Sequence, residues 1–148
     1  MTTFATSPVI IGDGAMPAAR EYIVQNFGVS DGVLAVCDTN TEPIAKSVFG
    51  TTERYVFPGD AIADPELAAP LEERAAAKKL LVAVGAGTIH DLVRYTAHKL
   101  GLPFISLPTA PSVDGFVSGV AAMTVGGQKI TFEAVPPLAL FAEPSIFM

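Results

Sequence analysis

The sequence is poor in the residue types that mark several classes of protein. It has a single cysteine, Cys37, so it has no internal disulfide framework, which fits a reducing compartment. It has a net charge of −6 and no basic cluster, which argues against a nucleic-acid partner. No apolar run reaches the roughly 18 residues of a membrane span, and the N-terminus lacks a secretory signal pattern. We therefore expect a cytoplasmic protein with no membrane and no nucleic-acid partner.

Charged residues are also scarce, at 16% of the chain, whereas half of the 148 residues are apolar. The length corresponds to one domain. Two interpretations of this apolar balance are open. A compact α/β core contains a buried sheet that is always rich in Val, Ile and Leu. Alternatively, the chain is one domain of a larger protein and leaves an interface uncovered.

The clearest pattern is a strand–turn–helix–strand unit over residues 80–107. Residues 80–84 form an apolar run of strand length that ends at Gly85-Ala86-Gly87. Helical spacing follows over 88–100, where Gly101 and Pro103 end the helix, and a second apolar strand covers 104–107. Such units build parallel sheets.

The rest of the chain extends this pattern. We expect strands at 8–11, 33–37, 53–57 and 138–142, a helix at 16–27, and a hairpin of 120–125 with 129–132 around Gly126-Gly127. Asp64-Pro65-Glu66 resembles a helix start, but Pro70 interrupts the pattern, so that helix is expected to begin near Leu71. The predicted fold is α/β, a mostly parallel sheet flanked by helices with a β-hairpin near the C-terminus.

The turn at Gly85-Ala86-Gly87 has the chemistry of an anion site. Its glycines let a ligand approach the backbone, and the next helix offers unpaired amides and the positive end of its dipole. The Rossmann fingerprint is not matched, because His90 stands where a third small residue is needed, and no P-loop lysine follows. The alternative is a glycine turn that only lets the helix pack closely on the sheet.

Asp38 directly follows the predicted strand at 33–37. In nucleotide-binding folds an acidic residue there accepts the hydroxyl protons of the adenosine ribose. A cap of the following helix is an equally good interpretation of Asp38.

Two motifs resemble a known family. They are GAGTIHD at Gly85–Asp91 and PTAPSVDG at Pro108–Gly115, with weaker matches in VIIGDGA at Val9–Ala15 and DTNT at Asp38–Thr41. Together they resemble the Rossmann-like nucleotide-binding half of sn-glycerol-1-phosphate dehydrogenases. Those enzymes are grouped with iron-containing alcohol dehydrogenases, glycerol dehydrogenases and dehydroquinate synthases.

The resemblance implies a set of cofactor contacts. The expected residues at NAD or NADP are Asp38, Gly85, Gly87, Thr88, Ile89, His90, Asp91, Thr109, Ala110, Pro111, Ser112 and Ser118. We expect the amides of Gly87 to His90 and the Thr88 hydroxyl to donate to phosphate oxygens, and Asp91 to complement the helix dipole. Asp114 is expected at the substrate, where its carboxylate accepts polyol hydroxyls, although Asp114-Gly115 alone would indicate only a turn.

The resemblance also implies a divalent metal (zinc, nickel or iron) that one Asp and two His hold in a helical domain after the sheet domain. His90 and His98 lie eight residues apart and do not make a metal pair, so we expect no metal ligand and no catalytic residue in this chain. Glu143-Pro144 departs from the Asp-rich stretch expected before that domain. We therefore expect residues 1–148 to be the dinucleotide-binding domain, without the helical metal-binding domain.

The implied reaction interconverts dihydroxyacetone phosphate, a small phosphorylated substrate, and sn-glycerol 1-phosphate. Two alternatives are open: a non-catalytic nucleotide-binding module, and an enzyme similar to glycerol dehydrogenase or dehydroquinate synthase. The resemblance favours a domain with an uncovered interface. We therefore expect an apolar surface at Phe116, Val117, Val120 and residues 138–147, and self-association into a homo-oligomer.

Overall fold

The centre of the molecule is a six-stranded sheet in which every neighbouring pair of strands is parallel. The computed structural model describes residues 6–28, 32–50, 52–111 and 116–147. The strand order is β1-β8-β5-β4-β2-β3. The strands are β1 (Val9–Ile11), β2 (Val33–Asp38), β3 (Arg54–Phe57), β4 (Leu80–Gly85), β5 (Phe104–Pro108) and β8 (Ala139–Ala142).

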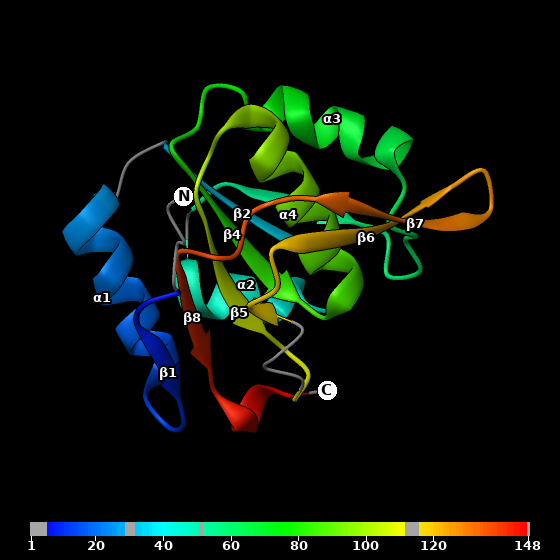
Figure 1. Cartoon of the computed structure of the whole chain (residues 1–148). Helices are drawn as coiled ribbons and strands as arrows, with labels where there is room; N and C mark the ends of the chain where they lie inside the picture. Colours follow the sequence, from blue (N-terminus) through cyan, green and yellow to red (C-terminus); the bar gives the residue numbers. More distant parts are fainter. Residues whose placement is uncertain (1–5, 29–31, 51, 112–115, 148) are drawn as a thin grey trace.

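Helices cover both faces of this sheet (Figure 1). The helices α1 (Ala15–Phe27) and α2 (Glu42–Phe49) pack on one face. The helices α3 (Pro65–Ala75) and α4 (Gly87–Leu100) pack on the other, together with the antiparallel pair β6 (Val120–Val125) and β7 (Gln128–Glu133). A short 3₁₀ helix covers Pro144–Ile146.

The middle strand β4 shows why the sequence makes a sheet that is buried on both faces. Leu80, Val82 and Val84 pack toward α1 and α2. Leu81 and Ala83 pack toward α3 and α4. All five side chains are fully buried, which explains a continuous apolar run instead of an alternating one. The predicted α/β fold is confirmed.

The hairpin prediction is also confirmed. Gly126 and Gly127 have φ values of 58° and 83°, the left-handed conformation that both central residues of a type I′ turn require. The strands pair from Val120 with Glu133 to Val125 with Gln128.

Two helix predictions need correction. The helix α3 begins at Pro65, not near Leu71, because the Asp64 carboxylate accepts a hydrogen bond from the Glu66 amide at 2.7 Å. Pro70 lies inside this helix, where the burial of Ala68 and Leu71 offsets the backbone bond that proline cannot make. A helix after Asp38 was expected without bounds, although Pro43 in the first turn of α2 and Gly50 after its end are typical boundary signals.

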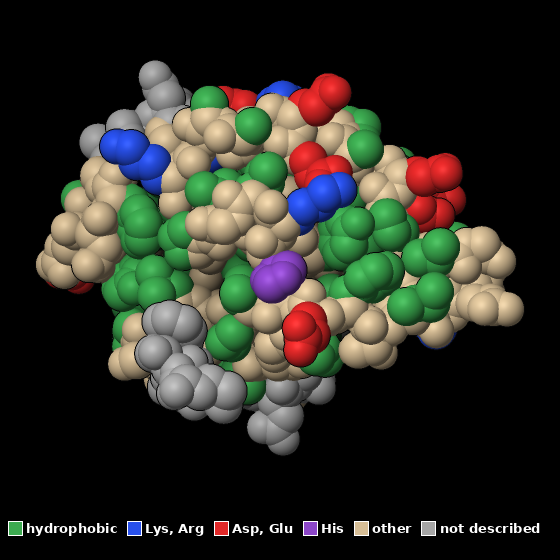
Figure 2. Space-filling model, turned by 45° about the horizontal axis from the view of Figure 1, so that its top comes forward, with side chains coloured by type: hydrophobic (Ala, Val, Ile, Leu, Met, Phe, Trp, Pro, Cys, Tyr) green, Lys and Arg blue, Asp and Glu red, His purple; other side chains and the backbone are tan. Residues whose placement is uncertain are grey.

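The predicted apolar surface is wrong in part. Residues 139–142 form β8, which lies between β1 and β5 and is fully buried. The Phe116 side chain is buried too, whereas Val120 and Leu138 are exposed. Figure 2 shows hydrophobic side chains on the right of the molecule, where the hairpin lies, and the exposed Val125 and Ile130 belong to it. Self-association stays a prediction. Among the described helices none is both long and apolar enough to span a bilayer.

Candidate functional site

The strand order creates a crevice at the carboxyl ends of β2 and β4. From β2 the chain passes through α2 outward to β3, and from β4 it passes through α4 to β5 in the opposite direction. Open α/β sheets bind ligands where neighbouring connections diverge in this way. A cavity of about 440 Å³ lies here. Its lining consists of Asp38, Asn40, Thr41, Gly59, Ala61, Ala86, Gly87, Thr88, Ile89, Thr109 and Ala110.

The two glycines of the central turn have different roles. A Cβ atom on Gly85 would lie 2.8 Å from the Cβ and Cγ1 atoms of Ile89, so this glycine allows close packing of α4 on β4. A Cβ atom on Gly87 would meet nothing within 4 Å. Gly87 is exposed and lines the cavity. The packing interpretation therefore fits Gly85, whereas Gly87 leaves space for a ligand.

The N-terminus of α4 offers free donors to this cavity. The N-cap residue, Ala86, has no side chain that could cap the helix. The first three amides of an α-helix have no partner within the helix, and here these are the amides of Gly87, Thr88 and Ile89. The His90 amide donates instead to the Ala86 carbonyl at 3.1 Å, so it is not one of the unpartnered amides, and its contact with phosphate stays a prediction.

The His90 side chain connects the glycine turn to β5. The ring contacts the Ala86 carbonyl through Nδ1 at 3.0 Å and the Ser106 hydroxyl through Nε2 at 2.6 Å. Because a carbonyl can only accept, Nδ1 carries the proton, and Nε2 accepts from the Ser106 hydroxyl. Burial, with a smaller contribution from the nearby Arg94 charge, lowers the pKa of His90 to about 3, against the raising effect of the Ala86 hydrogen bond. The ring is therefore neutral and holds the Ala86 carbonyl in place.

Asp38 braces the loop at the end of β2. Its Oδ1 atom accepts from the amides of Asn40 at 2.8 Å and Thr41 at 2.9 Å. The buried Thr41 hydroxyl lies 2.9 Å from the Val84 carbonyl, to which it donates, and so ties this loop to β4. The N-cap of α2 is Thr41, so Asp38 shapes the turn before the helix while it also lines the cavity.

The loop after β5 joins the same crevice. The Thr109 amide donates to the Gly85 carbonyl at 3.0 Å, which holds this loop against the glycine turn. Thr109 is buried and Ala110 is half-buried, and both line the cavity. The ends of β2, β4 and β5 therefore meet at one place.

A second cavity of about 390 Å³ continues from the first along α4. Gly87 and Ala110 line both. The other residues of the second cavity are His90, Asp91, Arg94, Phe116, Ser118, Val120, Ala122 and Thr131. The glycine turn thus lies between the two cavities. This arrangement suits a ligand that has a bulky group at each end and a narrower linker at the turn.

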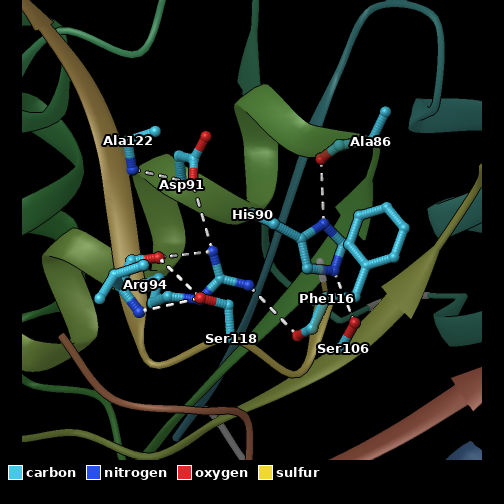
Figure 3. A network of polar contacts seen from close by, with 9 residues as sticks. Ala86, His90, Asp91, Arg94, Ser106, Phe116, Ser118 and Ala122 are labelled. Carbon is cyan, nitrogen blue, oxygen red and sulfur yellow. Dashed lines mark hydrogen bonds and ion pairs between the residues drawn. The ribbon is translucent and has the colours of Figure 1, made fainter. Parts of the chain in front are cut away.

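A polar network forms the wall of the second cavity (Figure 3). The buried Arg94 guanidinium contacts the Asp91 carboxylate at 3.2 Å and donates to the carbonyls of Phe116 and Val120 at the same distance. The Asp91 carboxylate also accepts from the Ala122 amide. Burial raises the pKa of Asp91, against the lowering effects of that amide and of Arg94.

The predicted site residues therefore gather around the turn. Asp38, Gly87, Thr88, Ile89, Thr109 and Ala110 line the first cavity, and His90, Asp91 and Ser118 line the second. Gly85 is buried beneath the turn, and Pro111 is exposed and lines neither cavity. Ser112 and Asp114 lie outside the described residues.

Sequence reasoning did not find three supporting residues, Thr41, Ser106 and Arg94. Thr41 and Ser106 are buried polar residues, and such burial is a signal only once the fold is known. Arg94 lies among charged and polar helix residues and resembles a solvated position. Its partners are 22 and 26 residues away in the sequence.

Within the part of the chain that the structure describes, no three His, Cys, Asp or Glu side chains lie together as a metal site requires. The described residues thus offer no cage for the metal that the resemblance implies, and we assign no reaction step through a metal to them. Cys37 is buried, which raises its thiol pKa to about 12 and makes it a poor nucleophile.

Comparisons with known proteins agree with this architecture. A glycerol-1-phosphate dehydrogenase [NAD(P)+] from Bacillus subtilis is 35% identical over 148 residues, which is 91% of this chain and 37% of that protein. One from Metallosphaera sedula is 29% identical, over 93% of this chain and 41% of that protein. The crystal structure of an iron-containing alcohol dehydrogenase from Corynebacterium glutamicum has a TM-score of 0.82 at 19% identity, over 99% of this chain and 42% of that one.

This chain thus spans well under half the length of these relatives. The family model described as iron-containing alcohol dehydrogenase matches residues 10–148. The chain belongs to the iron-containing alcohol dehydrogenase family.

Proposed function

We propose that this chain binds NAD(H) across the two cavities, with the pyrophosphate at the N-terminus of α4. The observation that carries the proposal is the uncapped helix start, where three amides without intrahelical partners face a cavity beside Gly87. Backbone amides and the helix dipole together stabilise a phosphate anion. The names of the curated relatives, which include NAD(P)+, support the same cofactor class.

Asp38 gives the dinucleotide a direction. It lies at the end of β2 in the first cavity, where a carboxylate accepts hydroxyl hydrogen bonds from the adenosine ribose. The adenosine half then occupies the first cavity. The nicotinamide half occupies the second, beside Ser118 and under the hairpin.

The first cavity favours NAD(H) over NADP(H). Asp38 lies there, and the lining residues include no Lys or Arg that could pair with a 2′-phosphate. A phosphate close to the carboxylate would be repelled, so we expect NADH to bind about tenfold or more tightly than NADPH. Asp38→Asn removes the repulsion and one good ribose acceptor, and should bring the two affinities together.

The proposed reaction is that of the relatives, the interconversion of dihydroxyacetone phosphate and sn-glycerol 1-phosphate. The metal would then polarise the carbonyl that receives the hydride. We propose that a helical domain supplies its ligands and that this chain holds the cofactor. By the resemblance, Ser112 would contact the cofactor and Asp114 the substrate.

The test combines binding and turnover on the purified chain after its intact mass has been checked. Calorimetric titration should show one NADH site per chain. An assay with dihydroxyacetone phosphate, NADH and added zinc or nickel should show no turnover by this chain alone. No NADH binding would contradict the cofactor proposal, and turnover by homogeneous 148-residue protein would contradict the proposed division of roles.

A further inference from the structure

We infer that Arg94 is a positioning residue, which fixes the backbone around Ser118 and thereby shapes the cavity for one half of the ligand. This inference rests on the proposed dinucleotide site. Arg94 is a buried charged residue that lies outside the phosphate turn and is not among the proposed cofactor contacts, so the proposed function gives it no role.

The contacts of Arg94 point outward from its helix. Arg94 is 2% exposed, although it carries a full charge, and it lies on α4 about two helical turns after Gly87. Nη2 donates to the Phe116 carbonyl and Nη1 to the Val120 carbonyl, each at 3.2 Å. A guanidinium can serve several acceptors at once because its donors form a rigid planar fork.

These two carbonyls lie two residues before and two residues after Ser118. Arg94 therefore holds the segment 116–120 at both ends. Within the segment, the Ser118 Oγ atom accepts from the Val120 amide at 3.1 Å, which fixes the hydroxyl relative to the held backbone. A rigid first layer of donors and acceptors lowers the entropic cost of binding a ligand.

Asp91 completes the arrangement from the same helix. Its Oδ1 atom lies 3.2 Å from Nη1 of Arg94 and accepts from the Ala122 amide of β6. Asp91 thus aligns the guanidinium and attaches the hairpin to α4. Figure 3 shows Asp91, Arg94, Phe116 and Ala122 in one connected network between the helix and the strand.

The Phe116 ring extends this connection to the phosphate turn. It packs on the His90 ring with centroids 4.4 Å apart, and His90 holds the Ala86 carbonyl. The His90 ring has its own hydrogen bonds to the Ala86 carbonyl and the Ser106 hydroxyl, so the turn does not depend on Arg94 for its position. Arg94 fixes the backbone of the segment that faces the second cavity.

The experiment compares two ligands on the same variants. ADP carries only the adenosine and pyrophosphate, which occupy the first cavity and the turn, whereas NADH also fills the second cavity. In Arg94→Met a side chain of similar length remains without the hydrogen bonds. We expect its NADH affinity to fall by about tenfold or more, while its ADP affinity stays within about twofold of the parent.

Two further variants separate positioning from stability. Arg94→Lys keeps the charge but loses the planar fork, so it should recover part of the NADH affinity. Ile23→Ala truncates a buried side chain of α1, on the opposite face of the sheet, and destabilises the chain without touching the network. We expect it to bind both ligands as the parent does. Hydrogen exchange at the Val120 and Ala122 amides should accelerate in Arg94→Met and not in Ile23→Ala.

The outcomes are distinct. Equal weakening of NADH and ADP in Arg94→Met, or no change in either, overturns the positioning role. If Arg94→Met does not fold, Arg94→Lys is the deciding variant. The inference is overturned if its ratio of NADH affinity to ADP affinity and its hydrogen-exchange rates at the Val120 and Ala122 amides both equal those of the parent. If the parent itself binds neither ligand, the proposed function fails and this inference fails with it.

Discussion

Gly85 and Gly87 stand two residues apart in one turn and are glycines for different reasons. Gly85 has no room for a Cβ atom, because Ile89 lies against it. Gly87 has room and an ordinary backbone conformation, so nothing in the fold requires a glycine there. The space beside Gly87 is part of the proposed phosphate site.

This difference predicts opposite effects for the same substitution. Gly87→Ala should leave the free energy of unfolding unchanged or raise it by up to about 1 kcal/mol, because alanine is a better helix residue than glycine. Its NADH affinity should fall, and Gly87→Val should lower it further. Gly85→Ala, the matched control, should lose about 1–3 kcal/mol of stability through overpacking. Urea unfolding and NADH titration check both effects, and parental NADH binding by folded Gly87→Val would show that this turn does not hold the phosphates.

His90 gives a second prediction at this scale, for the dependence of stability on pH. Its pKa is about 3 in the folded chain and 6.5 in the reference state, so between these values the unfolded chain binds a proton that the folded chain does not. The stability that neutral His90 supplies is fully present above pH 6.5 and is lost as the pH falls toward 3.

We expect this loss to approach about 1 kcal/mol per pH unit between pH 6 and pH 4. His90→Gln keeps a donor and an acceptor but does not titrate, and the carboxylates common to both proteins cancel in the comparison. Urea unfolding of both proteins over this range measures the difference. A difference that does not change with pH would mean that His90 does not stay neutral in the folded chain.

At the scale of elements, a remote carboxylate supports the first helix. The Glu143 Oε1 atom, just after β8, accepts from the amides of Gly14 and Met16, both at 3.2 Å. These amides begin α1, whose N-cap glycine has no side chain. Glu143 therefore has a structural role in joining the end of β8 to the start of α1.

Glu143→Ala should lower the free energy of unfolding by about 1 kcal/mol, the usual effect of losing a helix cap. Glu143→Gln keeps the acceptor without the charge and should lose less. Neither should change NADH affinity, since Glu143 lines neither cavity. Urea denaturation tests the effect on stability, and NADH titration tests the effect on binding. If Glu143→Ala has the same free energy of unfolding as the parent, Glu143 does not stabilise the start of α1.

Elements also show how far the sequence alone could predict this molecule. The unit β4-α4-β5 could be predicted because its strands are buried on both faces and Gly101 and Pro103 end its helix clearly. The sequence also carries the start signal of α3 at Asp64-Pro65-Glu66, but it could not show that burial of Ala68 and Leu71 overrides the effect of Pro70. The cofactor motifs identified the turn. The supporting roles of His90 and Arg94 depend on Ser106, Phe116 and Val120, which become neighbours only in the fold.

At the scale of the whole molecule, the parallel sheet brings three loops together at one edge. The ends of β2, β4 and β5 supply Asp38, the α4 amides and Thr109 to one cavity, and the hairpin covers its continuation. The account's central claim is that this edge holds a dinucleotide with its pyrophosphate at Gly87–Ile89.

A crystal structure of the chain with NADH tests that claim most directly. The account predicts pyrophosphate oxygens within hydrogen-bonding distance of the Gly87, Thr88 and Ile89 amides, with the adenosine ribose at Asp38 and the nicotinamide beside Ser118. NADH bound with its pyrophosphate away from the start of α4, or with its adenosine in the second cavity, would contradict it.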